Sequence, residues 1–406
     1  MSNAPVGQNN VLGNSLQVMK VVTSQLSTHG PVSFASEFSR TADTRLPRAS
    51  LADLTFLVVG GGALGNEVLK NLGLLGAGRT IVVDPDRVEE SNLSRSVFFR
   101  VSDCGRPKAT TLRTSLTSSF PDTRWESHDC EIADLGYGQL AGIDLILTCA
   151  DNDLARVEAA WLALCLDIPL VDGGLGGPDS WQGRVSFFAG RHAACFCCML
   201  TPRRRRQLLS LSLAAGHSCG RRTEPTFSST PTMASIIGAL QVDFGLRCLH
   251  ELGNSDRKNR SDRQSRTIEI SLGSAPVLRQ FVTPSSKGCP FHDAVPRPRF
   301  ALPHPRATGR ELLDSESAAA VELDWPICTM ARCLDCGSDW RPMRRVAWLR
   351  RYGACPRCAS RRILETETVS SLDLNSRWID TPLVEIGLPD HHLYAVSTKL
   401  VQQEGA

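Results

Sequence analysis

The sequence predicts an α/β fold with a doubly wound, mainly parallel sheet, followed by a small zinc-ribbon module. Three observations lead to this prediction. Short apolar runs alternate with helical stretches from Leu51 onward, a pattern typical of strands covered on both faces by helices. A glycine-rich turn at residues 60–65 lies between the first apolar run and the first helical stretch. Near the other end of the chain, two Cys-x-x-Cys pairs have the spacing of zinc knuckles.

The elements of the α/β part follow from apolar runs and from helical periodicity. Predicted strands cover residues 54–59, 80–83, 145–149 and 170–171, and the helices between them cover 63–75, 108–118 and 154–166. The alternating stretches 183–188 and 267–272 predict two later strands, for which an antiparallel orientation is open. Residues 232–249 predict an amphipathic helix, whose apolar stripe is more typical of a core or a dimer interface than of a ligand site.

Composition shifts divide the chain into five parts. Residues 1–35 form a polar leader that we expect to be flexible, and residues 36–293 form the α/β domain. Residues 294–326 carry four prolines followed by acidic and alanine-rich sequence, which predicts a linker. Residues 327–368 contain the predicted zinc ribbon. Residues 369–406 form a C-terminal segment whose role the sequence does not indicate.

Composition also argues against several classes of protein. The chain has 406 residues, 42% of them hydrophobic, and a net charge of +3, which is too small to indicate nucleic-acid binding. No apolar run reaches the ~18 residues of a membrane span, and the N-terminus lacks a secretory signal pattern. Fifteen cysteines, several in Cys-x-x-Cys pairs, favour reduced thiols, bound zinc and a cytoplasmic location. The run Arg203–Arg206 indicates a solvated helix start or loop, with a docking patch for an acidic partner as the alternative.

The glycine-rich turn predicts a phosphate-binding site of the Rossmann-like kind. Gly60, Gly62 and Gly65 follow a predicted strand and begin a predicted helix, so backbone N–H groups can approach a phosphate there. Asp84 ends the next predicted strand, 24 residues after Gly60, where a carboxylate can accept hydrogen bonds from ribose hydroxyls. Up to this point an NAD-dependent dehydrogenase fits nearly as well.

The polar residues that follow favour attack on ATP over NAD binding. Asn92 and Arg95 lie in the polar loop after Asp84, and Lys108 begins the next predicted helix. Arg95 and Lys108 can neutralise the charge that develops on an attacked phosphate, and Asp151 at the end of a strand suits Mg²⁺. In this order and spacing, the set resembles the adenylating domain shared by ubiquitin-activating enzymes and the ThiF and MoeB enzymes that activate sulphur-carrier proteins. The resemblance spans roughly residues 38–292. Ser96 departs from it, because the family has Gln at that position.

The resemblance implies an ATP-binding adenylating domain over residues 36–293. The residues that it implies for holding Mg²⁺-ATP are Gly60, Gly62, Gly65, Asp84, Asp86, Asn92, Arg95, Lys108, Asp151 and Asn152. Among them, Arg95 and Lys108 also act on the phosphates, and Asp151 binds the magnesium ion. In homodimeric relatives, an arginine before the domain reaches into the ATP site of the partner subunit. Arg40 is the candidate for that role, and nearby arginines compete for it.

The cysteines predict two zinc sites. The family has a split structural zinc site, and the resemblance implies that its ligands here are Cys195, Cys198, Cys289 and His292. A histidine departs from the four cysteines of relatives, although Cys₃His is an ordinary zinc set, and Cys197 could replace one ligand. The ribbon ligands are Cys333, Cys336, Cys355 and Cys358, with 18 residues between the two pairs. A closed four-cysteine site contributes stability or a docking surface and no catalysis.

Cys219 is the candidate nucleophile. In relatives that form a thioester, the cysteine lies in a crossover loop before the helix that corresponds to residues 232–249. A thiolate there can capture the acyl group of an acyl-adenylate. His217, Arg221 and Arg222 are expected to lower the pKa of the Cys219 thiol. The alternative is an inert loop thiol.

The leading functional hypothesis is a bacterial-type activating enzyme for a ubiquitin-like protein that ends in glycine. It would form an acyl-adenylate, pass the acyl group to Cys219 and then to a conjugating enzyme. In the second hypothesis, the enzyme adenylates a sulphur-carrier protein, and the acyl-adenylate is then used for sulphur transfer. A dehydrogenase and an inactive scaffold subunit are weaker alternatives, because Arg95, Lys108 and Asp151 are all present. A single adenylating domain implies a homodimer, and neither nucleic acid nor membrane is an expected partner.

Overall fold

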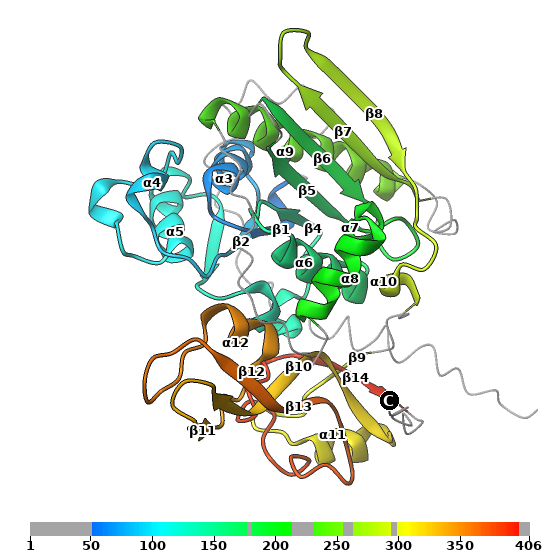
Figure 1. The fold of residues 1–406 in the computed structure, drawn as a ribbon. Coiled ribbons are helices and arrows are strands. Elements are labelled where there is room, and N and C mark those ends of the chain that lie inside the picture. The colour runs from blue at the N-terminus through cyan, green and yellow to red at the C-terminus, as the bar shows by residue number, and fades with distance from the viewer. Residues whose placement is uncertain (1–50, 177–180, 213–229, 255–262, 294–298, 398–406) are drawn as a thin grey trace, which may run out of the picture.

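The computed structural model describes residues 51–176, 181–212, 230–254, 263–293 and 299–397 (Figure 1). Two units stack on each other, an α/β domain that ends near residue 293 and a smaller β-rich domain formed by residues 299–397. The predicted leader 1–35, Arg40 and Cys219 lie outside the described residues.

An eight-stranded sheet forms the centre of the α/β domain. Its order is β3-β2-β1-β4-β5-β6-β7-β8. The strands are β1 (Thr55–Val59), β2 (Arg79–Val83), β3 (Arg124–His128), β4 (Leu145–Thr148), β5 (Leu170–Leu175), β6 (Gln182–Phe188), β7 (Ser265–Ser271) and β8 (Val277–Thr283). The first five strands in the chain are parallel, and β6, β7 and β8 are antiparallel to their neighbours. This confirms the predicted fold class, and it decides the orientation of the later strands, which the sequence left open, as antiparallel.

Two strands were absent from the prediction, and both lie at an edge of the sheet. β3 reads Arg-Trp-Glu-Ser-His and β8 alternates poorly, with nearly all of its side chains exposed. An edge strand has one neighbour and needs no continuous apolar run, so the periodicity that identifies central strands is missing.

Helices cover both faces of this sheet because alternate strand residues point to opposite sides. Phe56 and Val58 of β1 join the core under α3 (Ala63–Leu75), α5 (Lys108–Ser119) and α9 (Pro231–Asn254). Leu57 and Val59 join the opposite core. The helices on that side are α6 (Asp153–Leu166), α7 (Phe196–Met199), α8 (Pro202–Ser212) and α10 (Pro290–Asp293). Short helical segments complete the domain: α4 (Glu90–Leu93), η1 (Val101–Asp103), η2 (Ile132–Asp134) and η3 (Tyr137–Leu140).

Helix α9 is long and apolar enough to cross a membrane by length and composition alone. It contacts α3 and strands β4, β5 and β6, and 56% of its apolar window is buried within the fold. We therefore interpret α9 as the core helix that the periodicity of residues 232–249 predicted.

Residues 299–397 form the second domain. The strands are β9 (Arg299–Ala301), β10 (Ala320–Cys333), β11 (Asp339–Trp340), β12 (Arg344–Arg345), β13 (Ile363–Asp373) and β14 (Leu393–Ser397), and the helices are α11 (Gly309–Glu316) and α12 (Val346–Tyr352). The long strand β10 pairs with β11, β12, β13 and β14, and β9 pairs with β14.

The predicted linker at 294–326 is therefore wrong for its described part. Thr308 and Glu311 form a capping box that starts α11, and Leu312 and Leu313 of that helix are buried. The residues from 369 to 397, which the sequence left without a role, complete the same sheet and core through β13 and β14. The predicted ribbon is thus an extension of a larger domain, and the proline-rich sequence obscured its first strand.

A buried ion cluster joins the two domains. Arg345 of β12 lies 2.6 Å from Glu131 Oε2, 2.6 Å from Asp134 Oδ1 and 2.8 Å from Glu158 Oε1. The side chain of Arg345 is only 3% exposed. Nearby, Trp161 of the α/β domain donates to Asp324 of β10 over 2.8 Å. The second domain is therefore fixed against α6 and the segment after β3.

Candidate nucleotide-binding and metal sites

The sheet order has a topological switch point between β1 and β4. From β1 the chain proceeds to β2 and β3 on one side, and β4 then returns to the other side of β1. Ligands of open α/β sheets bind at such a switch point, outside the carboxyl ends of the strands. The glycine-rich turn follows β1 and Asp151 follows β4. The predicted phosphate-binding turn and the predicted magnesium ligand therefore both lie at this switch point.

Close backbone contacts require glycine at positions 60 and 65 of the turn. Gly60 has φ +101°, and its N–H donates to Val83 O over 2.9 Å. A Cβ on Gly65 would lie 2.0 Å from Gly60 O, which no side chain can tolerate. A Cβ on Gly62 would meet nothing within 4 Å, and no side chain caps α3 at this residue. The first N–H groups of the 13-residue helix α3 therefore lie beside an open space that suits a phosphate.

Asp84 has a structural role in this turn, because both of its carboxylate oxygens accept hydrogen bonds from the backbone. Gly61 N donates to Asp84 Oδ2 over 2.6 Å, and Asp86 N donates to Asp84 Oδ1 over 2.8 Å. Burial raises the pKa of the Asp84 carboxyl group, while Lys108 and the Gly61 N–H act in the opposite direction. Each oxygen keeps a second lone pair that a ribose hydroxyl can use.

Asn66 is a site residue that sequence reasoning missed. Its side-chain amide is fully buried and donates to Gly61 O over 2.9 Å and to Gly62 O over 3.0 Å. Its Oδ1 accepts from Phe98 N over 3.0 Å. Asn66 thus ties the glycine-rich turn to the segment just after Arg95. The sequence signal that could have identified this residue is an asparagine directly after the last glycine of the turn.

The predicted cationic residues lie beside the turn. Lys108 Nζ is 3.1 Å from Asp86 Oδ2, and Lys108 N donates to Asp86 O over 2.9 Å. Asp86 therefore holds the ammonium group at the start of α5. Asn92 Oδ1 accepts from Glu89 N over 3.0 Å and caps α4, so its carbonyl end has a structural role. Arg95 follows α4 and is partly buried.

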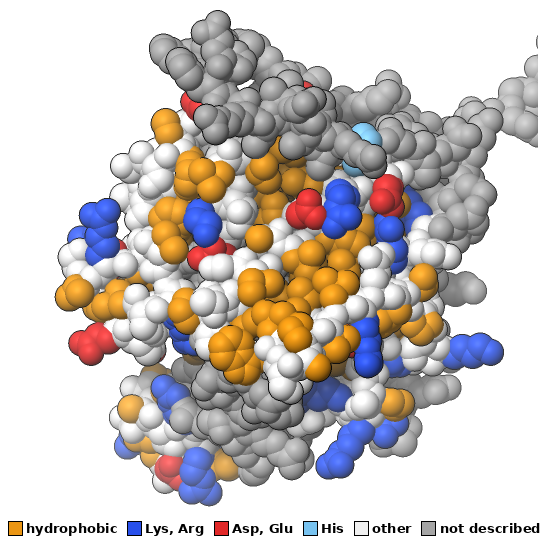
Figure 2. Space-filling model, turned by 90° about the horizontal axis from the view of Figure 1, so that it is seen from above, with side chains coloured by type: hydrophobic (Ala, Val, Ile, Leu, Met, Phe, Trp, Pro, Cys, Tyr) orange, Lys and Arg blue, Asp and Glu red, His pale blue; other side chains and the backbone are white. Residues whose placement is uncertain are grey.

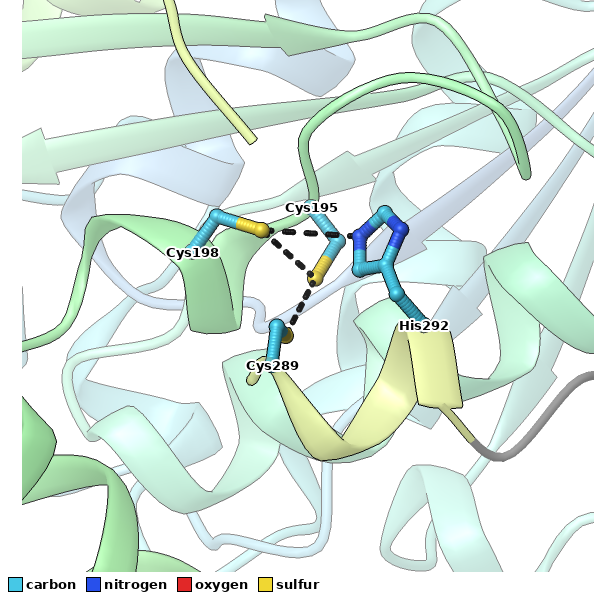
Figure 3. Close-up of side chains that lie close together, drawn as sticks. All are labelled: Cys195, Cys198, Cys289 and His292. Carbon is cyan, nitrogen blue, oxygen red and sulfur yellow. Dashed lines mark hydrogen bonds between the residues drawn. The ribbon is translucent and has the colours of Figure 1, made fainter. Parts of the chain in front are cut away.

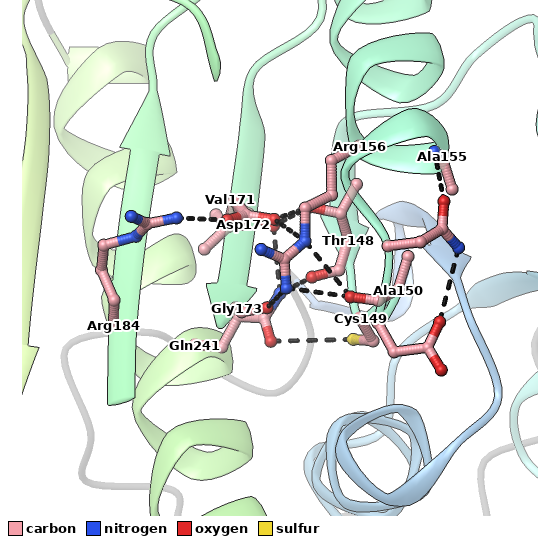
Figure 4. Close-up of polar contacts among 12 residues, drawn as sticks. Thr148, Cys149, Ala150, Ala155, Arg156, Val171, Asp172, Gly173, Arg184 and Gln241 are labelled. Carbon is pink, nitrogen blue, oxygen red and sulfur yellow. Dashed lines mark hydrogen bonds and ion pairs between the residues drawn. The ribbon is translucent and has the colours of Figure 1, made fainter. Parts of the chain in front are cut away.

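Asp151 and Asn152 form the loop between β4 and α6. Asp151 is exposed, so its carboxylate is accessible to a magnesium ion. Asn152 caps α6, because its Oδ1 accepts from Ala155 N over 2.9 Å, and its Nδ2 lies 3.4 Å from Asp151 Oδ1. Figure 4 shows this loop next to a polar cluster from β5, β6 and α9. The donor set at the switch point fits a nucleotide with a divalent cation, with Asp151 as the residue that would hold the cation.

The first predicted metal site is assembled from two distant segments (Figure 3). The Cys195 and Cys198 sulphurs are 3.8 Å apart, the Cys195 and Cys289 sulphurs are 3.7 Å apart, and Cys198 Sγ is 3.5 Å from His292 Nε2. Zinc at about 2.3 Å from sulphur and about 2.0 Å from nitrogen in a tetrahedron needs separations of about 3.8 and 3.5 Å. The four ligand atoms therefore fit zinc, and Cys197 is not among them.

One arginine of the run 203–206 supports this site. Arg205 is 6% exposed and donates to Cys197 O over 3.0 Å, to Gly288 O over 3.2 Å and to Ser286 Oγ over 2.9 Å. It thereby joins the two segments that supply the metal ligands. Arg204 pairs with Asp153 at 2.7 Å. The prediction that the whole run is solvated is wrong for Arg205, because the distant segment around residue 288 buries it.

The second metal site has two matching knuckles. The ligand sulphurs of Cys333 and Cys358 are 3.6 Å apart, as are those of Cys336 and Cys355. Each knuckle closes through a residue with positive φ, Gly337 at +69° and its counterpart Ala359 at +57°. All four ligand atoms lie within 4.8 Å of one another, which fits a structural zinc site with no open position.

Burial makes four other described thiols poor nucleophiles. Burial raises the pKa of Cys248 to about 11 and that of Cys130 to about 12, and it raises the pKa values of the Cys149 and Cys165 thiols further. Cys104, in contrast, is exposed.

Comparison with known proteins identifies the family. The sequence profile of the ThiF family matches residues 38–280, which is more than half of the chain. The chain belongs to the ThiF family. This confirms the resemblance that the motifs indicated. The matched residues include the glycine-rich turn and nearly all of the eight-stranded sheet, and they end before Cys289.

The relatives of this ThiF-family chain include enzymes of two kinds. SUMO-activating enzyme subunit 2 of Dictyostelium discoideum is 32% identical over 144 residues, covering 35% of this chain and 21% of the relative. The sulfur carrier protein adenylyltransferase of Thermus thermophilus is 34% identical over 161 residues, covering 38% of this chain and 56% of the relative. The match therefore spans about a fifth of the length of the first relative and just over half of the length of the second. The crystal structure of E. coli MccB with ATP matches with a TM-score of 0.44 and 17% identity, covering 60% of this chain and 67% of MccB.

Proposed function

We propose that this ThiF-family protein uses ATP to adenylate the C-terminal glycine of a ubiquitin-like or sulphur-carrier protein. The observation that carries the proposal is the switch point between β1 and β4, where the open N-terminus of α3, the ammonium group of Lys108 and the carboxylate of Asp151 lie at one edge of the sheet. Mg²⁺ held by Asp151 and the cationic residues would offset charge on the α-phosphate as the carboxylate attacks it and pyrophosphate leaves.

An exposed apolar surface supports the proposal that the substrate is a protein. Figure 2 views the molecule from the side of the β7–β8 hairpin and shows apolar side chains gathered on that face. On β8, Leu278 is 65% exposed, Phe281 41% and Val282 52%. Exposed apolar groups on a sheet edge are typical of surfaces that bind another protein.

Exchange of labelled pyrophosphate into ATP tests the activity. A panel of ubiquitin-like proteins and sulphur carriers, each with a free terminal glycine, is supplied to the full-length protein. We expect exchange with at least one member of the panel and none without a carrier. Asp151→Asn should lower exchange by a factor of about 100 or more, whereas Asp53→Asn, at an exposed carboxylate away from the switch point, should not change it. Carrier-independent exchange, or NAD binding without exchange, would refute the proposal.

The finer proposal is conjugation through a thioester on Cys219, followed by transfer to a conjugating enzyme. It is supported by relatives named as SUMO- and NEDD8-activating enzymes and by the poor nucleophilicity of the buried thiols described above. The alternative is sulphur transfer, favoured by the Thermus relative. Cys219→Ala should retain exchange and lose a reductant-sensitive adduct with the carrier, and Cys104→Ala should keep both. Exchange without any adduct in the unaltered protein favours the sulphur carrier.

We also propose a cytoplasmic homodimer in which Arg40 completes the partner's site. Mixing Arg40→Ala and Asp151→Asn proteins tests this arrangement. In a mixed dimer, one of the two sites would contain neither substitution, so random exchange of subunits should restore about a quarter of the original activity. No recovery after demonstrated subunit exchange would show that Arg40 does not act across the dimer.

A further inference from the structure

A polar cluster beside the Asp151 loop carries an unbalanced positive charge (Figure 4). Its centre is Asp172 of β5, which is fully buried. Arg156 Nε lies 3.3 Å from Asp172 Oδ1, and Arg184 Nη2 lies 3.5 Å from Asp172 Oδ2. Thr148 also donates to Oδ1 over 2.8 Å. One carboxylate thus faces two guanidinium groups, and the cluster has a net charge of +1 when all three are ionised.

The side chains of the two arginines differ in their hydrogen bonds. Arg156 donates to Ala150 O over 2.9 Å and to Gly173 O over 3.1 Å, in addition to its ion pair. Its side chain is 13% exposed, and it fixes the backbone immediately before Asp151. Arg156 is therefore a positioning residue for the loop between β4 and α6.

Arg184 is only partly engaged. Its one polar contact among the described residues is the ion pair with Asp172, and its Nε is buried without a partner. The side chain is 31% exposed, so part of the guanidinium group is accessible. Since Asp172 already pairs with Arg156, the charge of Arg184 is available to an incoming anion.

The backbone of β5 leaves this charge uncovered. A Cβ on Gly174 would lie 3.7 Å from Arg156 Nη1 and 3.9 Å from Arg184 Nη2, so the two guanidinium groups flank a residue without a side chain. Gly173 has a different role, because a Cβ there would lie 2.3 Å from Gln241 Oε1 on a side that is already packed. The absence of a side chain at Gly174 therefore leaves room beside the arginine pair for an extended polypeptide end.

We propose that Arg184 binds the C-terminal carboxylate of the carrier protein before its adenylation, an inference that rests on the proposed function. The carboxylate would be held next to the Asp151 loop. One of its oxygens then forms the bond to the α-phosphorus of ATP, the bond to the bridging oxygen breaks, and that electron pair leaves with pyrophosphate. No proton transfer is needed.

The test compares the carrier that supports exchange with the same carrier amidated at its C-terminus. Dissociation constants are measured by calorimetry with a non-hydrolysable ATP analogue present. A charge-assisted hydrogen bond makes the free carboxylate bind about tenfold or more tightly than the amide. Arg184→Gln should reduce this ratio to near one, and Arg184→Lys should retain part of it. Arg332→Gln, at an exposed arginine of the second domain, should leave it unchanged.

The outcomes separate the inference from the proposed function. Affinity for ATP alone serves as the control for folding and for the nucleotide site. A ratio that persists in Arg184→Gln overturns the inference and leaves the proposed function intact. Loss of ATP affinity in Arg184→Gln and in Arg184→Lys would assign Arg184 to the phosphates or to the fold and would also overturn it. If the unaltered protein catalyses no carrier-dependent exchange, the proposed function and the inference fail together.

Discussion

Replacement of Arg345 by methionine should strongly destabilise the contact between the two domains. The guanidinium group serves three carboxylates, of which Glu158 is 2% and Glu131 is 7% exposed at the side chain. Methionine keeps an apolar stem of similar length and removes only the charge and the hydrogen bonds. Breaking a buried ion pair by removing one partner costs about 3–5 kcal/mol. Asp134, at 32% exposure, can be solvated and adds little.

The loss should depend on pH in a defined direction. Burial raises the pKa of Glu158 above its ordinary value of 4.5, and Arg345 opposes this effect. Without Arg345 the folded-state pKa rises further, so the folded variant holds the proton more tightly than the unfolded chain. The destabilisation should therefore be complete above the folded-state pKa and shrink as the pH falls through it. Glu158→Gln added to Arg345→Met should recover about 1 kcal/mol or more at neutral pH.

Urea denaturation followed by tryptophan fluorescence measures the free energy of unfolding at about pH 5 and about pH 8. The matched control is Arg332→Met, which removes an exposed arginine paired with Asp339 in the same domain and should cost less than about 1 kcal/mol. A loss for Arg345→Met as small as that of the control would refute the reasoning. So would a large loss that is equal at the two pH values, because it would not arise from buried carboxylates.

Two further predictions concern the glycine-rich turn and the metal sites. Gly65→Ala should lower ATP affinity more than tenfold, because its Cβ would lie 2.0 Å from Gly60 O. Gly273→Ala should leave the affinity unchanged, because its Cβ would have nothing within 4 Å. Equal affinities of the two variants in a calorimetric titration would contradict this prediction. Metal analysis should find two zinc ions per chain, one after Cys289→Ser and still two after Cys197→Ser, since only Cys289 lies in the four-ligand set. Retention of both ions by Cys289→Ser would exclude the first site.

The sequence determined the features that depend on local spacing. A helix over residues 63–75 and the glycine-rich turn before it follow from periodicity and from backbone contacts that only glycine permits. The two knuckles of the second metal site are closed within a few residues of each Cys-x-x-Cys pair. The alternation of strands and helices along the chain likewise predicted a mainly parallel sheet, although it did not predict which strands are neighbours.

Tertiary structure alone decided which distant residues share a burial environment. Nothing near Arg205 in the sequence distinguishes it from the other arginines of its run, and its burial comes from the segment around residue 288. The same holds for Arg345, whose three carboxylate partners lie 187 to 214 residues away along the chain. Charge on a side chain predicts exposure, and only the folded chain shows where a buried partner offsets the cost of desolvation.

The extent of the second domain was decided in the same way. Local composition at 294–326 indicated a linker because prolines are followed there by acidic and alanine-rich sequence. Its apolar residues gain their partners only when β13 and β14 return to β10, so that Val321 packs with Leu372 and Tyr394. Burial of apolar area depends on the strands that come together in space. A short stretch of sequence contains no information about them.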